Sequence, residues 1–259
     1  MTLGGQRLLV TGATGFLGRH LVRTLAEETG AALRLVTRAG GRDDLPAAAR
    51  QASELVHADL TEEKHLPELC RGIDTVVHAA ALMPGSLGYD AQACRRVNLD
   101  MVLRLAHAGA AAGVRRFVFV SSTAAMGAPT ADTVDQTTPC RPTSPYEVAK
   151  RAAEEGLLEL AAASGLEVVI VRPCLIAGEG QRGKFAQQRA KGGHDHERDF
   201  IAPALGGHGL REQCAHLALG VRPKAWLNPA MMRAGLFALP FERRDPNHAQ
   251  ACNPCRLGR

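Results

Sequence analysis

Three polar residues in the middle of the chain have the types and spacing for proton transfer. Tyr146 and Lys150 stand four residues apart in Pro-Tyr-Glu-Val-Ala-Lys, and Ser122 ends an apolar run about 24 residues earlier. Residues four apart share one face of a helix, so the Lys150 ammonium can approach the Tyr146 phenol. A nearby positive charge favours the phenolate and lowers the tyrosine pKa from its usual value near ~10. We therefore predict that Tyr146 exchanges a proton with a substrate oxygen and that the Ser122 hydroxyl hydrogen-bonds this oxygen.

A second motif lies near the start of the chain, where an apolar run at 7 to 11 gives way to glycines spaced three apart, Gly12, Gly15 and Gly18. Such glycines allow unusual backbone angles, close approach of a phosphate, and close packing of a helix on a strand. The expected helix at 16 to 28 adds free N–H groups and a positive dipole end, which together bind a pyrophosphate. The alternative is a tight turn without a ligand. The cofactor-binding residues predicted in this motif are Gly12, Thr14, Gly15, Phe16, Leu17 and Gly18.

Other strand ends predict the rest of a dinucleotide site. After the expected strand at 32 to 37, Arg38 occupies the region where NAD-binding folds usually place an acid, and its guanidinium can hold the 2′-phosphate of NADP. We therefore predict NADP as the cofactor, with NAD as the second choice; the alternative for Arg38 is a solvated loop residue. Asp59 and Leu60 are expected near the adenine, although Asp59 could instead be a helix N-cap. The small residues Ala79 and Ala80 let the cofactor cross a strand end, and Lys150 is expected to hold the nicotinamide ribose.

The elements that position these residues alternate between strand and helix. Apolar, strand-like runs at 7–11, 32–37, 54–57, 74–80, 115–121 and 167–172 are separated mostly by helical patterns. This alternation predicts an α/β fold in which a doubly wound parallel sheet of the Rossmann type has helices on both faces. Two long helices are expected at 91–113 and 145–164, and their pairing with a second copy would give a homodimer.

These motifs together resemble the extended short-chain dehydrogenase/reductases, the NAD(P)-dependent epimerases, dehydratases and reductases. The resemblance covers residues 7 to about 180 and rests on the order of the following: Thr11 to Gly18, Asp59-Leu60, His78-Ala79-Ala80, Asn98, Ser121-Ser122, Tyr146 with Lys150, and Arg172-Pro173 followed by Gly178. It implies Ser122, Tyr146 and Lys150 as the catalytic triad. It also implies that Asn98 and Pro173 belong to the cofactor site, although an isolated asparagine in a helix is usually a surface residue.

The chain departs from this family after the two serines. Ala125-Met126-Gly127 replaces the Val-Tyr-Gly of many sugar-nucleotide enzymes, which weakens the case for a nucleotide-sugar substrate. Thr123 competes with Ser122 for the hydroxyl role, and we prefer Ser122 because it lies four residues before Met126, as in the family.

Composition fits an enzyme-like chain, with 46% hydrophobic and 22% charged residues in 259. The net charge of +5 comes from residues 181 to 259, which carry 13 Lys and Arg against 6 Asp and Glu. This region lacks interleaved aromatic residues, so we expect no nucleic-acid partner. With no apparent secretion signal or apolar run long enough for a membrane span, we expect a cytoplasmic protein with no membrane contact. Seven scattered cysteines predict free thiols.

The sequence divides into two regions. Residues 1 to 180 are expected to form the dinucleotide-binding and catalytic domain, and residues 181 to 259 a short, diverged substrate region. The latter has only 79 residues and little periodicity, so it could be abbreviated, diverged, or the product of a shifted reading frame. We predict no metal site, because His194 to Glu197 suggests a solvated loop and His248, Cys252 and Cys255 lack a fourth ligand.

Two functions remain open at this point. The first is an NAD(P)-dependent oxidoreductase or epimerase that transfers hydride at a hydroxyl or carbonyl carbon of a small-molecule substrate, with Tyr146 as the acid/base. The second is a non-catalytic NADP-binding sensor with an incomplete substrate lobe. An intact triad argues for the enzyme, and the short C-terminal region argues for the sensor.

Overall fold

The structure is a computed structural model, and it describes residues 3–38, 44–128, 138–173, 176 and 237–239. Several of the sequence motifs lie outside these residues. They are Gly178, the histidine-rich stretch from His194 to Glu197, the set of His248, Cys252 and Cys255, and nearly all of the region 181 to 259. The expectations that concern them stay expectations.

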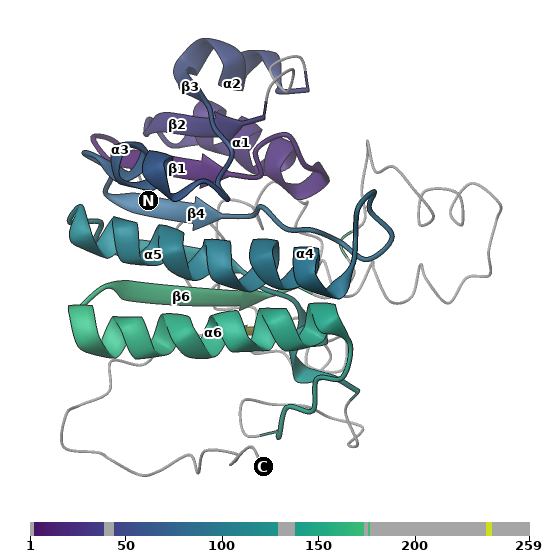
Figure 1. Cartoon of the computed structure of the whole chain (residues 1–259). Helices are drawn as coiled ribbons and strands as arrows, with labels where there is room; N and C mark the ends of the chain where they lie inside the picture. Colours follow the sequence, from purple (N-terminus) through teal and green to yellow (C-terminus); the bar gives the residue numbers. More distant parts are fainter. Residues whose placement is uncertain (1–2, 39–43, 129–137, 174–175, 177–236, 240–259) are drawn as a thin grey trace, which may run out of the picture.

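Six parallel strands form most of the sheet (Figure 1), in the order β3-β2-β1-β4-β5-β6. Their bounds are β1 (Arg7–Thr11), β2 (Ala32–Thr37), β3 (Ser53–His57), β4 (Thr75–His78), β5 (Arg116–Val120) and β6 (Glu167–Arg172). This is the strand order of a dinucleotide-binding fold, in which the order reverses between β1 and β4. The predicted doubly wound parallel sheet is therefore confirmed. A short seventh strand, β7 (Phe237–Leu239), which the sequence did not predict, pairs antiparallel with β6.

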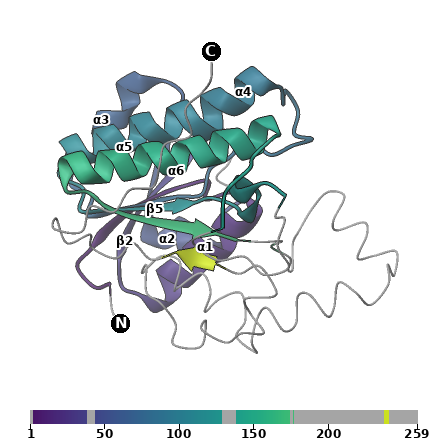
Figure 2. The same ribbon diagram turned by 90° about the horizontal axis from the view of Figure 1, so that it is seen from below.

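Helices cover both faces of this sheet. Figure 2 shows α1 (Phe16–Glu28) and α2 (Ala47–Ala52) on one side, and α3 (Leu66–Cys70), α4 (Ala91–Arg95), α5 (Met101–Ala111) and α6 (Pro145–Ser164) on the other. Two 3₁₀ turns, η1 (Glu63–His65) and η3 (Thr123–Met126), complete the connections. The arrangement explains why the strands are apolar on successive residues: neighbours such as Leu8 and Leu9 enter different cores, and both are fully buried.

The two long helices differ from one another in regularity. The expected helix at 91–113 is divided into α4 and α5 by a π-helical turn, η2 (Arg96–Asp100). Helix α6 is continuous and has strong end signals: Ser144 forms a capping box with Glu147, Pro145 occupies the first turn, and the left-handed Gly165 ends the helix. These signals fix the point at which α6 begins, and hence the position of Tyr146 in its first turn.

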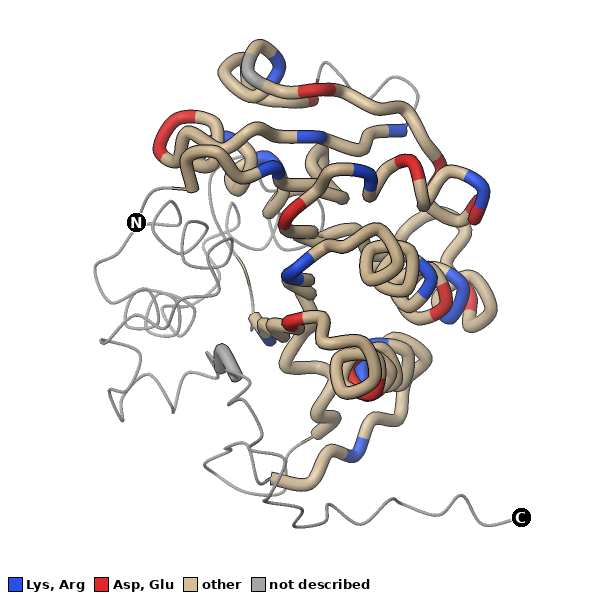
Figure 3. Tube along the Cα trace, turned by 90° about the vertical axis from the view of Figure 1, so that its left-hand side faces the viewer, with Lys and Arg blue, Asp and Glu red and all other residues tan. Residues whose placement is uncertain are grey.

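Segments of Lys and Arg and segments of Asp and Glu are interspersed along the described chain (Figure 3). Many of these residues form exposed ion pairs, such as Arg116 with Glu167 and Arg71 with Glu68. No helix in the described part is long and apolar enough to span a membrane. The three cysteines that the structure describes, Cys70, Cys94 and Cys140, are free thiols.

Candidate functional site

The glycine turn between β1 and α1 is shaped by close backbone contacts. Gly12 has a φ of 72°, and a Cβ on it would lie 2.6 Å from the carbonyl carbon of Ala79. A Cβ on Gly18 would lie 1.9 Å from the Gly12 carbonyl oxygen. Glycine is therefore required at both positions, because side chains would collide with backbone atoms that cannot move away. Ala79 and Ala80 belong to the same contact, so the structure brings these predicted cofactor residues together.

The start of α1 has the chemistry of a phosphate site. Gly15 is the N-cap and has no side chain to cap the helix, and no acidic residue lies in the first turn. Gly15 is exposed, and within the described chain only the Gly12 carbonyl oxygen lies near its missing Cβ, at 3.2 Å. The first-turn N–H groups and the helix dipole thus face an open cradle without a competing carboxylate, which fits a pyrophosphate. Thr14, Phe16 and Leu17 are half-buried beside it.

Arg38 and Asp59 lie at the ends of neighbouring strands. Arg38 is exposed directly after β2, and the Ala58 amide donates to the Thr37 carbonyl at 3.1 Å, which keeps the two strand ends together. Asp59 accepts hydrogen bonds from the Thr61 amide at 2.8 Å and the Thr61 hydroxyl at 2.7 Å. These bonds, and to a smaller extent the charge of Arg38, lower the pKa of Asp59. The aspartate therefore closes a local turn with Thr61 and interacts with the charge of Arg38, whereas the N-cap of the following η1 is Glu62. Leu60 beside it is buried.

Ser122 and Tyr146 meet at the carboxyl end of β5. Ser122 is the N-cap of η3 and accepts a hydrogen bond from the Ala124 amide at 3.1 Å. Its hydroxyl also lies close enough to the Tyr146 phenol to favour the phenolate and lower the pKa of Tyr146. Thr123, the competing candidate, is held instead through its amide, which donates to the Pro173 carbonyl at 3.0 Å. The structure thus brings Ser122, rather than Thr123, into contact with the tyrosine.

The electrostatics of Tyr146 differ from the expectation. Burial raises the pKa of Tyr146 to about 12, Cys94 and Tyr89 add to the rise, and the nearby Ser122 hydroxyl opposes it. The prediction that Lys150 lowers this pKa is therefore wrong for the protein without a ligand. The physical reason is the position of the ammonium: Lys150 Nζ lies 6.0 Å from the centre of the tyrosine ring and donates a 2.9 Å hydrogen bond to the Val120 carbonyl.

Lys150 is itself almost completely buried. Its Nζ lies 4.5 Å from the centre of the Phe119 ring, which adds a cation–π contact to the hydrogen bond with Val120. Desolvation lowers the pKa of Lys150 to about 8, whereas the charge of Glu154 opposes this shift. The predicted four-residue spacing does place Tyr146 and Lys150 on one face of α6, and both point at the end of β5.

Asn98 is fully buried, so it is not the surface residue that an isolated asparagine in a helix usually is. Its Oδ1 accepts from the Leu82 amide at 2.9 Å, and its Nδ2 donates to the Leu82 carbonyl at 2.9 Å and to Cys94 Sγ at 3.3 Å. Asn98 therefore ties the segment after β4 to the π-helical turn. Such turns are frequent at functional sites.

Sequence reasoning missed two residues that pack on Tyr146. Cys94 is buried in a small cluster with Tyr146, and Tyr89 packs against this cluster. Burial raises the pKa of Tyr89, the Cys94 thiol adds to the rise, and the Tyr146 backbone opposes it. The sequence offers only a weak signal for Tyr89, because it follows a stretch rich in Gly and Pro that indicates a loop. What distinguishes this residue is that the chain has just two tyrosines.

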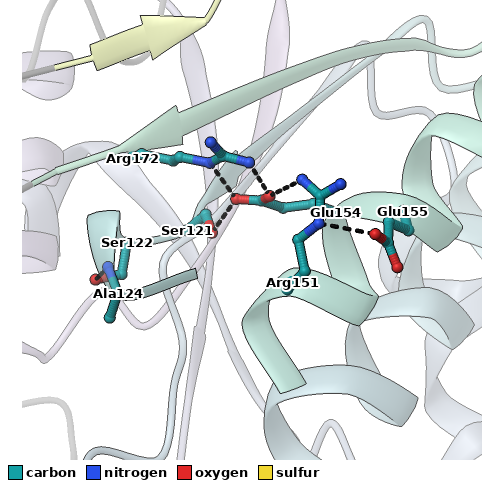
Figure 4. A network of polar contacts seen from close by, with 7 residues as sticks. All are labelled: Ser121, Ser122, Ala124, Arg151, Glu154, Glu155 and Arg172. Atoms are coloured by element: carbon teal, nitrogen blue, oxygen red, sulfur yellow. Dashed lines mark hydrogen bonds and ion pairs between the residues drawn. The ribbon is translucent and has the colours of Figure 1, made fainter. Parts of the chain in front are cut away.

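A buried ion pair behind the triad was also missed (Figure 4). Glu154 and Arg172 are 1% and 6% exposed, and Arg172 Nε donates to Glu154 Oε1 at 2.8 Å. The Ser121 hydroxyl donates to the same oxygen at 2.6 Å. A signal did exist in the sequence: Glu154 continues the four-residue spacing of Tyr146 and Lys150 along one face of α6.

His78, at the end of β4, lies between β1 and β5. Its Nδ1 shares a 2.8 Å hydrogen bond with the Thr11 hydroxyl, and its ring stacks on Phe117 and Phe119. Burial lowers the pKa of His78 to about 3, so the ring is neutral. His78 therefore has a packing role. Among the described residues no group of three or more His, Cys, Asp or Glu is arranged to hold a metal ion.

Comparison with known proteins identifies the family. Residues 8–199 match the family model described as the NAD dependent epimerase/dehydratase family. The UDP-glucose 4-epimerase of Azospirillum brasilense is 32% identical over 194 residues, which are 72% of this chain and 53% of that protein. The 3-beta-hydroxysteroid dehydrogenase of Mycolicibacterium neoaurum is 34% identical over 187 residues, which are 69% of this chain and 50% of that protein.

A solved structure agrees with these relatives. The UDP-glucose 4-epimerase of Thermus thermophilus, determined in complex with NAD, is 30% identical, has a TM-score of 0.55, and is matched over 64% of this chain and 54% of that one. The chain thus spans about half the length of the relatives it matches. On the strength of the family match, the strand order and the glycine turn, the chain belongs to the NAD dependent epimerase/dehydratase family, the extended short-chain dehydrogenase/reductases.

Proposed function

We propose that this protein is an NAD(P)-dependent oxidoreductase or epimerase that transfers hydride at a hydroxyl or carbonyl carbon of a small molecule. The observation that carries the proposal is the meeting of Ser122 and Tyr146, with Lys150 one helical turn further, at the sheet edge that also bears the glycine turn. Ligands of open parallel sheets bind at this edge, close to where the strand order reverses. When bound, the nicotinamide supplies or accepts the hydride.

The chain's own residues then have separate roles. The turn at Gly12, Gly15 and Gly18 binds the pyrophosphate through first-turn amides. Lys150 holds the nicotinamide ribose, while Asn98 and Pro173 support the same part of the site through the backbone segments that they fix. Ser122 hydrogen-bonds the substrate oxygen and so orients it toward the phenol.

Tyr146 carries the proton. With a pKa of about 12 in the protein without a ligand, the phenol holds its proton at neutral pH, and it is ready to donate to the oxygen of a carbonyl substrate. In the reverse direction it must first lose that proton, which favours reduction as the direction to assay first. Oxidation and re-reduction of one carbon would give epimerisation with no net release of reduced cofactor.

The phosphate end of the site favours NADP over NAD. Arg38 is an exposed cation at the end of β2, where an acid would repel a 2′-phosphate. The non-catalytic sensor has less support, because a sensor needs neither the contact between Ser122 and Tyr146 nor a buried lysine beside it.

The outer face of α6 suggests a partner, and we propose a homodimer through α5 and α6. Val148 and Leu158 on α6 are 48% and 38% exposed, although apolar. Pairing the helices with those of a second copy would cover both side chains. Light scattering during size-exclusion chromatography gives the mass; a monomer at micromolar concentration would contradict the proposal, and Leu158→Glu should dissociate a dimer.

The activity is tested with the full purified chain. Reduced NADP and NAD are each mixed with a panel of small ketones, steroid ketones and UDP-sugars, and absorbance of the reduced nicotinamide is followed. Loss of reduced cofactor indicates a reductase, while isomerisation of a sugar with catalytic cofactor indicates an epimerase. Cofactor binding without either reaction across the panel would instead favour the sensor.

A further inference from the structure

One face of α6 meets the end of β5 residue by residue. Tyr146, Lys150 and Glu154 follow one another at four-residue spacing, and each contacts a different member of the stretch from Val120 to Ser122. Tyr146 lies beside Ser122, close enough for the serine hydroxyl to affect the phenol; Lys150 donates to the Val120 carbonyl at 2.9 Å, and Glu154 accepts from the Ser121 hydroxyl at 2.6 Å. The proposed mechanism uses the first two contacts and leaves the third, which lies deep behind them, without a role.

Glu154 is itself anchored from the other side. Arg172, at the end of β6, donates to Glu154 Oε1 from Nε at 2.8 Å and to Oε2 from Nη2 at 2.5 Å (Figure 4). Arg151 Nη1 lies 3.5 Å from Oε2. The Ser121 amide donates to the Val171 carbonyl at 2.7 Å, so Ser121 is fixed through both its backbone and its side chain. Glu154 thus joins β5, β6 and α6 directly behind Ser122.

We propose that Glu154 is a positioning residue for the catalytic triad: by binding the Ser121 hydroxyl and Arg172, it holds the end of β5 where Ser122 meets Tyr146. The inference rests on the proposed function, since positioning matters only if Ser122 and Tyr146 act on a substrate. The ion pair lies at the end of β5 and β6, away from the glycine turn that would bind the pyrophosphate, so we expect its effect on the chemical step to exceed its effect on cofactor binding.

The charged and titratable groups around this contact come from four elements and from the loop before α6, where Cys140 interacts with Arg172. Lys150 and Arg151 lie on α6, Arg172 on β6, Cys94 on α4 and His78 on β4, and the last two interact electrostatically with Lys150. His78 is neutral. Glu154 is therefore the one carboxylate among these groups, and removing its charge leaves Lys150 and Arg172 buried without that partner.

The main test compares three variants of the full chain. Glu154→Gln removes the charge, Ser121→Ala removes only the hydroxyl contact and keeps the ion pair, and Glu155→Gln is the matched control. Glu155 is the next residue on the same helix and also pairs with an arginine, Arg151 at 2.8 Å, but it is exposed. We expect kcat per cofactor-binding site to fall about 30-fold in the first, about fivefold in the second and less than about twofold in the control, since small misplacements cost large factors in rate.

A purely structural role predicts a different result. Counting active molecules by cofactor titration removes the effect of a smaller folded fraction, so equal kcat per site in wild type, Glu154→Gln and Ser121→Ala would overturn the proposal. If Glu154→Gln does not fold, the Ser121→Ala variant provides the test, because it keeps the charges of both Glu154 and Arg172. The KM for the cofactor should stay within about twofold, since a loss confined to KM would also contradict positioning of the chemical step.

A second measurement does not need turnover. The chain has two tyrosines, so ¹³Cζ-tyrosine NMR gives two resonances, and Tyr89→Phe assigns them. Loss of the Ser122 contact should shift the Tyr146 resonance in Ser121→Ala and Glu154→Gln, but not in Glu155→Gln. Unchanged spectra would overturn the proposal. If wild type turns nothing over yet the Tyr146 signal responds, the proposed function fails and the positioning stands.

Discussion

Gly18 packs against Gly12 so closely that a Cβ on Gly18 would lie 1.9 Å from the Gly12 carbonyl oxygen. The contact presses the first turn of α1 against the end of β1, and Gly12 in turn presses against Ala79 at the end of β4. Three elements therefore share one backbone contact at the point where the strand order reverses. The shape of the phosphate cradle depends on this contact rather than on any polar side chain.

The contact predicts the effect of adding one methyl group. Gly18→Ala should lower the free energy of unfolding by about 3 kcal/mol, because neither backbone can move away without disturbing the sheet. Gly4→Ala is the control, since no atom of the described chain lies within 4 Å of its missing Cβ, and it should change stability by less than about 0.5 kcal/mol. Urea unfolding followed by circular dichroism measures both. Equal stability of the two variants would show that the turn is not tightly packed.

Replacement of the phenol tests the proton donor. Tyr146→Phe keeps the ring that fills the small cluster with Cys94 but removes the hydroxyl, so kcat should fall about 10²- to 10⁴-fold. Cofactor affinity, measured by quenching of the intrinsic fluorescence or by calorimetry, should change little. Turnover at the wild-type rate would remove Tyr146 from the mechanism.

Arg38 is predicted to set the choice of cofactor. In Arg38→Ala the affinity for NADP should fall at least about tenfold while the affinity for NAD stays constant, because the charge-assisted hydrogen bonds to a phosphate are worth about 1.5–3 kcal/mol. Arg71→Ala is a suitable control, since Arg71 is an exposed arginine paired with Glu68 on α3. Wild-type protein that binds NAD more tightly than NADP would contradict this role.

The buried lysine makes stability depend on pH. The pKa of Lys150 is about 8 in the folded protein against 10.5 in an unfolded chain, so between these values the unfolded chain binds more protons. The free energy of unfolding therefore rises with pH across this window, by about 3 kcal/mol in total. Below pH 8 both states are protonated and the cost of burying the charge is present in full.

Lys150→Met isolates this contribution. Burial raises the pKa of Cys70 to about 11 and that of Tyr146 to about 12, so these two groups make stability fall as the pH rises toward those values. Both groups are present in wild type and in Lys150→Met, so comparing the two proteins removes their effect. From pH 8 to pH 10.5 the free energy of unfolding of the wild type should therefore rise relative to that of Lys150→Met. Parallel curves from denaturant titrations would mean that Lys150 titrates normally.

The sequence predicts the scaffold well because the signals are local. Apolar runs define the six parallel strands within one or two residues, and the glycine spacing identifies the turn before α1. The four-residue spacing of Tyr146 and Lys150 places both on one face of α6 for the same reason. The division of the helix at 91–113 was missed, because a π-helical turn is produced by packing around Asn98 rather than by a residue preference.

Electrostatics were harder to predict than positions. The pKa of Tyr146 depends on how deeply the phenol is buried and on where the Lys150 ammonium points, and neither is encoded in the spacing of two residues. The role of Glu154 was hidden likewise, since its partners Ser121 and Arg172 are distant in sequence. Only the assembled sheet brings β5, β6 and α6 together around this carboxylate.

The π-helical turn η2 (Arg96–Asp100) has a consequence for variation in chain length. A turn of this kind holds one residue more than a regular α-helical turn, so deleting one residue there would restore a continuous α-helix. It would also rotate α4 by about 100° relative to α5, which would carry Cys94 away from the phenol of Tyr146. The length of this segment therefore sets which side of α4 faces Tyr146, and loss of one residue here would remove Cys94 from the cluster around the tyrosine.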